Sequence, residues 1–153
     1  MSLKPRYIVG IDLGTTTCSL SYIDRLSLEQ KPQLLDIPQR HDQNSTIKNN
    51  ILPSFCYLLV KSQIKQTRLG GEEKFLEKPY TVGLWAKTEY EKTPQRTASS
   101  AKSWLCHKEV DSNKKLLPWA SDEIIGSKRL SPVEISSFYL QHLKEAWNQQ
   151  IAK

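Results

Sequence analysis

Apolar and polar residues alternate near the start of the chain in the manner of β-strands. Residues 7–11 are rich in β-branched and aromatic side chains, and residues 18–24 place apolar side chains at every second position. Residues 13–17, rich in glycine and threonine, separate the two runs. We therefore predict a β-hairpin at the start of the chain and a third strand at residues 33–37.

The middle of the chain predicts a loop, a buried strand and a surface excursion, in that order. Residues 39–50 are polar, lack periodicity and contain several turn formers, which favours a loop. Residues 51–60 are mostly apolar and predict a buried strand that is entered through Pro53. Residues 61–79 are charged and contain a Gly-Gly pair, so we expect a surface hairpin or insertion that residues 81–83 close.

Two stretches with helical spacing follow, at residues 84–92 and 96–105. A Thr-Pro pair separates them, because proline and the residue before it disfavour a continuous helix. We predict a loop at residues 106–119 and one more edge strand at residues 123–130.

The last part of the chain carries the clearest helix start. Ser131 is a good N-cap, Pro132 suits the first helical position, and Glu134 completes a capping box. The positions that follow form one broad apolar face: Val133, Ile135, Phe138, Tyr139, Leu143, Ala146 and Trp147. Because a few short strands cover little of such a face, we expect the chain to be the first part of a larger domain.

Composition fits one domain with an extensive surface. A chain of 153 residues can bury roughly 70% of the surface that its unfolded form exposes. Its apolar share of 38% lies below the average of about 45–50%, so surface or loops take up a larger part than usual.

The net charge of +6 comes from 22 basic and 16 acidic residues. Such an excess can attract nucleic acid, acidic lipid or a polyphosphate, but residues 1–76 and 77–153 share it equally, so nucleic acid is not indicated. The longest apolar run is too short to span a bilayer, and the cysteines lack the spacing of a zinc site or disulfide framework. We expect a cytoplasmic protein that binds no membrane.

The segment that carries chemistry is the turn between the first two predicted strands. Asp12 would lie at the end of a strand, where one carboxylate can hold magnesium through the water shell that this ion retains. Gly14 permits a tight backbone, and the next amides can form an anion-binding nest to which Thr15 and Thr16 add hydroxyls. This arrangement suits the phosphates of a nucleotide, although neither the Walker pattern nor the dinucleotide fingerprint occurs. The alternative is a plain hairpin turn made of favourable turn residues.

Residues 10–16, Gly-Ile-Asp-Leu-Gly-Thr-Thr, match the opening of the ATPase domain of the DnaK-type seventy-kilodalton heat-shock chaperones, and the chain resembles that family. Further segments are similar in the same order, namely residues 52–55, 82–87, 101–102 and 131–140. The resemblance therefore spans nearly the whole chain.

The resemblance implies the actin-like ATPase fold, which is ribonuclease H-like and consists of a mixed sheet with flanking helices. Residues 1–153 would form the first half of lobe I, with ATP or ADP and Mg²⁺ as cofactors. Asp12 would act through magnesium-bound water, and Lys102 matches the lysine that positions the attacking water. The residues that would contact phosphate lie in the turn: Gly14, Thr15, Thr16 and Thr17.

In a full-length family member, ATP hydrolysis controls the binding of unfolded peptides, and co-chaperones take part in that cycle. The second phosphate loop, the adenosine-binding segment, the interdomain linker and the peptide-binding domain do not occur in the sequence. We therefore expect this chain to be inactive alone.

Other functions stay open from the residues alone. Sugar kinases of the same superfamily begin with the same first motif. A non-enzymatic protein-interaction module would use the basic surface, the four tryptophans and the charged excursion without nucleotide. A ribonuclease H-like nuclease would also place Asp12 on its first strand, but the Gly-Thr-Thr turn argues against it.

Overall fold

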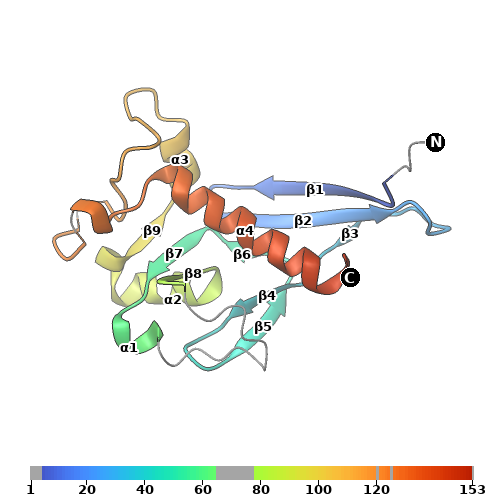
Figure 1. The fold of residues 1–153 in the computed structure, drawn as a ribbon, viewed down its shortest axis with the longest axis horizontal. Coiled ribbons are helices and arrows are strands. Elements are labelled where there is room, and N and C mark those ends of the chain that lie inside the picture. Colours follow the sequence, from blue (N-terminus) through green and yellow to red (C-terminus); the bar gives the residue numbers. More distant parts are fainter. Residues whose placement is uncertain (1–4, 65–77, 120, 125, 153) are drawn as a thin grey trace.

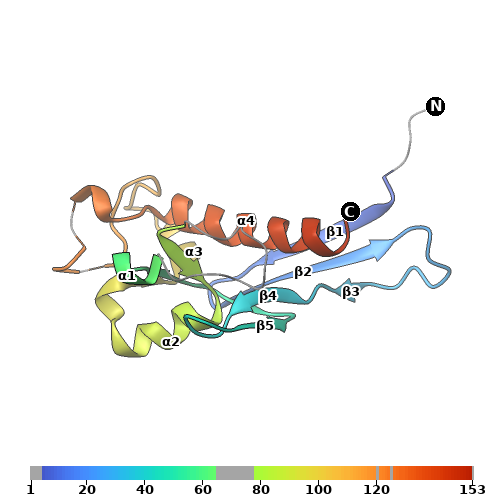
Figure 2. The same cartoon turned by 60° about the horizontal axis from the view of Figure 1, so that its bottom comes forward.

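The computed structural model describes residues 5–64, 78–119, 121–124 and 126–152. Small sheets lie between helices, with α4 on one side and α2 on the other (Figures 1 and 2). Every strand pair among the described residues is antiparallel, so parallel pairs of a mixed sheet are not found in this part of the chain. The α/β class with flanking helices is confirmed.

A long hairpin forms the start of the chain. β1 (Tyr7–Leu13) pairs with β2 (Thr17–Asp24) along its whole length, as the alternating pattern predicts. β3 (Gln33–Leu34) and β6 (Leu52–Pro53) also pair with β2, so β1 lies at the edge of the sheet that the described residues form. The strand predicted at residues 33–37 is confirmed in part, because the chain leaves this sheet after β3.

The loop predicted at residues 39–50 is wrong. β4 (Ile37–Arg40) and β5 (Thr46–Asn49) form a second hairpin. The buried Gln39 side chain donates to a backbone carbonyl oxygen (2.8 Å) and accepts from the N–H of Leu84 (3.0 Å). β5 is exposed along its whole length, so it shows no hydrophobic periodicity, and pairing with β4 and the hydrogen bonds of Gln39 decide the structure instead.

A third sheet has β7 (Phe55–Leu58) between β8 (Tyr80–Val82) and β9 (Thr97–Ser99). The buried strand predicted at residues 51–60 is confirmed in part, because Ser54 divides it into β6, which pairs with β2, and β7, which belongs to this third sheet. β8 confirms the prediction that the chain returns to a strand at residues 81–83, after the surface hairpin or insertion. Of the hairpin predicted at residues 61–79, residues 65–77 lie outside the described part, and the residues before them form the short helix α1 (Lys61–Ile64).

The helices agree with the sequence only in part. α2 (Leu84–Lys92) is confirmed, whereas the helix predicted at residues 96–105 is wrong in its first half, and α3 covers only Ala101–Leu105. Thr97 and Ala98 are instead buried in β9, where pairing with β7 overrides the helical spacing.

The edge strand predicted at residues 123–130 is also wrong. Gly126–Lys128 form a 3₁₀ turn, and an isolated bridge joins Leu117 to Leu130. The Arg129 guanidinium donates to the carbonyl oxygens of Ile124 (2.8 Å) and Ser121 (2.8 Å), which closes this segment into a compact loop instead of a strand.

The last helix, α4 (Pro132–Gln150), covers one side of the sheets (Figure 2). Its capping box is confirmed: Ser131 Oγ accepts from the N–H of Glu134 (3.1 Å), and the Glu134 carboxylate accepts from the N–H of Ser131 (2.7 Å). Ile135, Tyr139 and Leu143 are buried in a core shared with β2, β4, β6 and β7. Val133, predicted on the apolar face, is 40% exposed instead, because at 3.6 residues per turn it lies about 200° around the helix from the buried Ile135.

Candidate functional site

The turn between β1 and β2 has room for no side chain at Gly14. A Cβ atom built there would lie 2.2 Å from the carbonyl oxygen of Thr17, which is backbone and cannot move aside without opening the turn. Glycine at this position is therefore a steric requirement of the tight turn.

Ser54 hydrogen-bonds to the buried side of this turn. It is buried between β6 and β7, its hydroxyl donates to the carbonyl oxygen of Gly14 (2.9 Å), and its N–H donates to the carbonyl oxygen of Thr16 (2.9 Å). The Cys18 sulfur lies 3.3 Å from the same hydroxyl. Ser54 thus engages two carbonyl oxygens of the turn on its buried side.

The outer side of the turn offers donors. Thr15 and Thr16 are exposed, and neither their hydroxyls nor their N–H groups hydrogen-bond to another described residue. Thr17 is exposed at the first position of β2, and Asp12 is exposed opposite Ser19 near the end of β1. One carboxylate thus stands beside a row of neutral donors, a set of groups that fits phosphates and a hydrated magnesium ion.

Lys102, which is far away in sequence, acts through its charge on the thiol of Cys18 beside this turn. Burial raises the pKa of the Cys18 thiol, hydrogen bonds from Ser54 and with Gly14 oppose this, Asp12 adds to the rise, and Lys102 lowers it. Both charged side chains therefore lie close enough to Cys18 to act on it electrostatically. Lys102 is exposed at the second position of α3, two residues after Ser100, which adopts a left-handed backbone conformation (φ 54°) at the N-cap.

The structure thus places most of the predicted site residues at one end of the hairpin, namely Asp12, Gly14, Thr15, Thr16 and Thr17. Lys102 lies on α3 and is linked to them only through the effect of its charge on Cys18. Sequence reasoning did not assign Ser54 a role. The available signal was a serine between two apolar strand segments, which becomes informative only when its partners are known. Among the described residues, no three His, Cys, Asp or Glu side chains gather closely enough to hold a metal ion directly.

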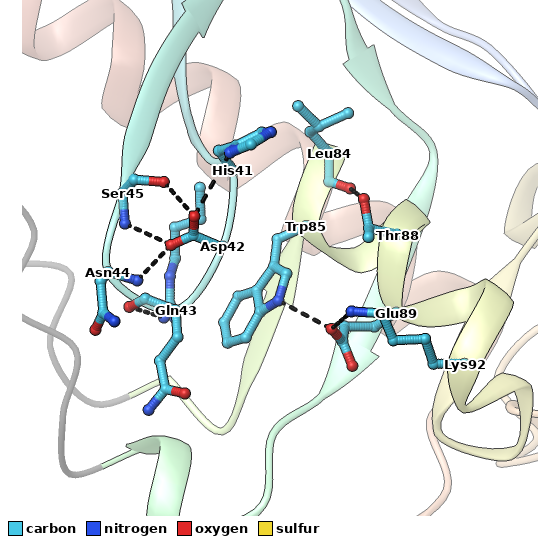
Figure 3. A network of polar contacts seen from close by, with 11 residues as sticks. His41, Asp42, Gln43, Asn44, Ser45, Leu84, Trp85, Thr88, Glu89 and Lys92 are labelled. Atoms are coloured by element: carbon cyan, nitrogen blue, oxygen red, sulfur yellow. Dashed lines mark hydrogen bonds and ion pairs between the residues drawn. The ribbon is translucent and has the colours of Figure 1, made fainter.

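A second polar cluster joins the β4–β5 hairpin to α2, and Figure 3 shows it. The buried Arg40 guanidinium lies 3.9 Å from the ring centre of Trp85 and donates to the carbonyl oxygen of Gln43 (2.8 Å). Burial lowers the pKa of Arg40 to about 10. The indole N–H of Trp85 donates to Glu89 of the same helix (3.3 Å). The Arg40 guanidinium on the Trp85 ring is therefore the contact that fixes the β4–β5 hairpin to α2.

In the described part of the chain, no helix is both long and apolar enough to cross a membrane. A comparison of the sequence with models of protein families found no match. A search of curated proteins also found no significant match.

Proposed function

We propose that this chain is the ATP-binding first part of a DnaK-type chaperone-like protein and forms the first half of lobe I of an actin-like domain. The observation that carries the proposal is the tight turn beside Asp12, whose carbonyl oxygens are engaged by the buried Ser54 and whose exposed threonines leave their donors available. A plain hairpin turn does not need two of its carbonyl oxygens held by a buried serine from another strand segment.

Each residue has a distinct role in this proposal. The carboxylate of Asp12 would hold Mg²⁺ through water molecules bound to the ion. The backbone amides of Gly14–Thr17 and the hydroxyls of the three threonines would donate hydrogen bonds to phosphate oxygens. Lys102 orients the attacking water and offsets negative charge. Bound Mg²⁺ supplies neutralisation of the charge that develops on the phosphates.

In the longer protein, ATP hydrolysis controls the binding of unfolded peptides, together with co-chaperones in the cytoplasm. We propose this from the sequence resemblance combined with the geometry of the turn.

Titration calorimetry with ATP and ADP in the presence of Mg²⁺ tests the proposal, on this chain and on the longest product of its reading frame. Asp12→Ala should weaken nucleotide binding by the longer product, and Lys102→Ala should reduce its turnover more than its binding. Lys87→Ala, at an exposed lysine on α2, is the matched control and should change neither.

The proposal fails if the longer product does not bind nucleotide, and a partner protein bound without any effect of ATP would then favour an interaction module. Phosphate transfer from ATP to a small sugar would favour a sugar kinase instead.

A further inference from the structure

A pocket outside the candidate nucleotide turn lies where β9 and α3 meet the residues after α2. Its volume is about 530 Å³, within the range of ligand pockets. Buried residues of β9 and Leu117 form its floor, and its rim carries the exposed side chains of Tyr90, Gln95, Ser100 and Trp119. The exposed rim makes it an open groove, which suits an extended ligand that lies across it better than a small molecule that must be enclosed.

A stack of rings holds Trp119 in place without burying it. The Trp119 ring lies on Trp104 with 4.9 Å between ring centres and 24° between planes, and Trp104 in turn lies 5.8 Å from the His107 ring. Trp119 nevertheless remains 63% exposed. Tyr90 is 41% exposed and packs on Phe55 at 5.4 Å between ring centres. Two aromatic side chains are thus positioned in advance on the rim, at little entropic cost to a ligand that packs on them.

The lining defines the charge of the ligand. No Asp, Glu, Lys or Arg lines the pocket within the part of the chain that the structure describes. A phosphate or carboxylate would find no cation there, and an ammonium group would find no anion. The two tryptophan rings are also nearly parallel and in contact, so they leave no gap for a methylated ammonium between them.

We propose that this pocket binds a neutral, proline-rich peptide segment in the polyproline II conformation. Such a segment is already extended and rigid, and its proline rings pack on exposed aromatic rings. Its backbone carbonyl groups have no internal partners, so they need donors from the protein. The side chains of Gln95 and Ser100 supply these, since neither hydrogen-bonds to another described residue. This inference does not depend on nucleotide binding by the turn.

The test is a titration of the full chain with end-capped decaproline, followed by tryptophan fluorescence and by calorimetry. We expect saturable binding that Trp119→Ala weakens at least about tenfold, because a bound proline segment would cover the exposed Trp119 ring, and tryptophans buried on binding are among the residues whose truncation costs most. Gln95→Ala should weaken binding less, through the lost donor. Leu28→Ala, at a fully exposed position between β2 and β3, should bind like the unchanged chain.

Circular dichroism of each variant confirms that it is folded, which the exposure of Trp119 and Gln95 favours. The proposal is overturned if decaproline shows no saturable binding up to about 1 mM. It is also overturned if a Gly-Ser peptide of equal length binds as well, if Trp119→Ala binds unchanged, or if a neutral disaccharide saturates the signal where decaproline does not.

Discussion

Ser54 shows how one small polar residue can determine the geometry of a turn 40 residues away in sequence. Its hydroxyl and its N–H both donate to carbonyl oxygens of the β1–β2 connection, and its own side chain is buried. A backbone carbonyl that loses its partner in such a place retains its desolvation cost. The conformation of the turn therefore depends on Ser54 as well as on the glycine inside it.

Ser54→Ala should lower the free energy of unfolding by about 1–2 kcal/mol, because the carbonyl oxygen of Gly14 loses its hydroxyl donor. Urea denaturation followed by far-UV circular dichroism measures this. Thr15→Ala, in the same turn but exposed, should stay within about 0.5 kcal/mol of the unchanged chain. Equal stability of the two variants would mean that Ser54 does not hold the turn.

At the scale of elements, β1 is unusual because it is exposed on both faces and at one edge. Ile8, Val9 and Ile11 are 56%, 43% and 50% exposed, and β2 is the strand that pairs with β1 among the described residues. Edge strands with exposed apolar side chains pair with other chains unless charge or a cover prevents it.

We therefore expect this chain to self-associate as its concentration rises, and Val9→Lys to reduce this association, because a lysine on an edge strand opposes strand pairing. Sedimentation velocity across a concentration series measures the effect. Leu28→Lys adds the same charge at a fully exposed loop position and should change association much less. If both variants behave alike, net charge and not the β1 edge governs association.

A partly buried histidine joins α4 to β4. His142 Nε2 lies 2.8 Å from the carbonyl oxygen of Pro38, to which its N–H donates. Burial lowers the pKa of His142, the Pro38 carbonyl and Glu145 oppose this, and Lys78 adds to the lowering. Lys78 and Glu145 themselves form an ion pair at 2.7 Å. The folded state thus favours the neutral imidazole more than the unfolded chain does.

The unfolded chain should consequently take up a proton at His142 first as pH falls below the ordinary value of 6.5. The contribution of His142 to the free energy of unfolding is complete above that pH. It is lost as the pH falls below that value, with a slope of at most about 1.4 kcal/mol per pH unit. Urea denaturation between about pH 7.5 and 5.5 should show this loss, and His142→Gln should show less of it. His107→Gln, at an exposed histidine, should retain the full dependence, and a His142→Gln variant that also retains it would refute the assignment.

Local signals in the sequence predicted the elements that depend on local interactions. The alternating hairpin, the capping box at Ser131 and the helix at residues 84–92 all follow from nearby residues. The β4–β5 hairpin and β9 could not be predicted from nearby residues, because contacts of Gln39 and Thr97 with distant parts of the chain decide their structure. The same holds for the candidate site. The residues of the turn could be recognised from the local sequence, whereas the role of Ser54 depends on a hydrogen bond to a residue 40 positions away.

At the scale of the whole molecule, α4 is the element that connects the separate sheets. Its buried face lies in one core with residues of β2, β4, β6 and β7, and Trp147 near its end packs edge-on against Tyr7 and Tyr22 of the first hairpin at 5.2 and 5.3 Å between ring centres. Figure 1 shows the helix crossing in front of these strands. The two-stranded β4–β5 sheet would be marginally stable by itself, and all three sheets bury residues in the same core as this helix, so we expect the sheets to depend on it.

Leu143→Ala therefore tests whether the chain unfolds as one unit. Leu143 is fully buried, and its truncation should cost about 2–5 kcal/mol through lost burial and the cavity that remains. If α4 joins the sheets into one cooperative structure, tryptophan fluorescence and far-UV circular dichroism should give coincident urea transitions, and both should shift together in the variant. Leu140→Ala, on the same helix but 39% exposed, should shift them much less. Separate transitions for the two probes would instead show that the first hairpin unfolds independently of the β7 sheet, since α4 would then hold only one of them.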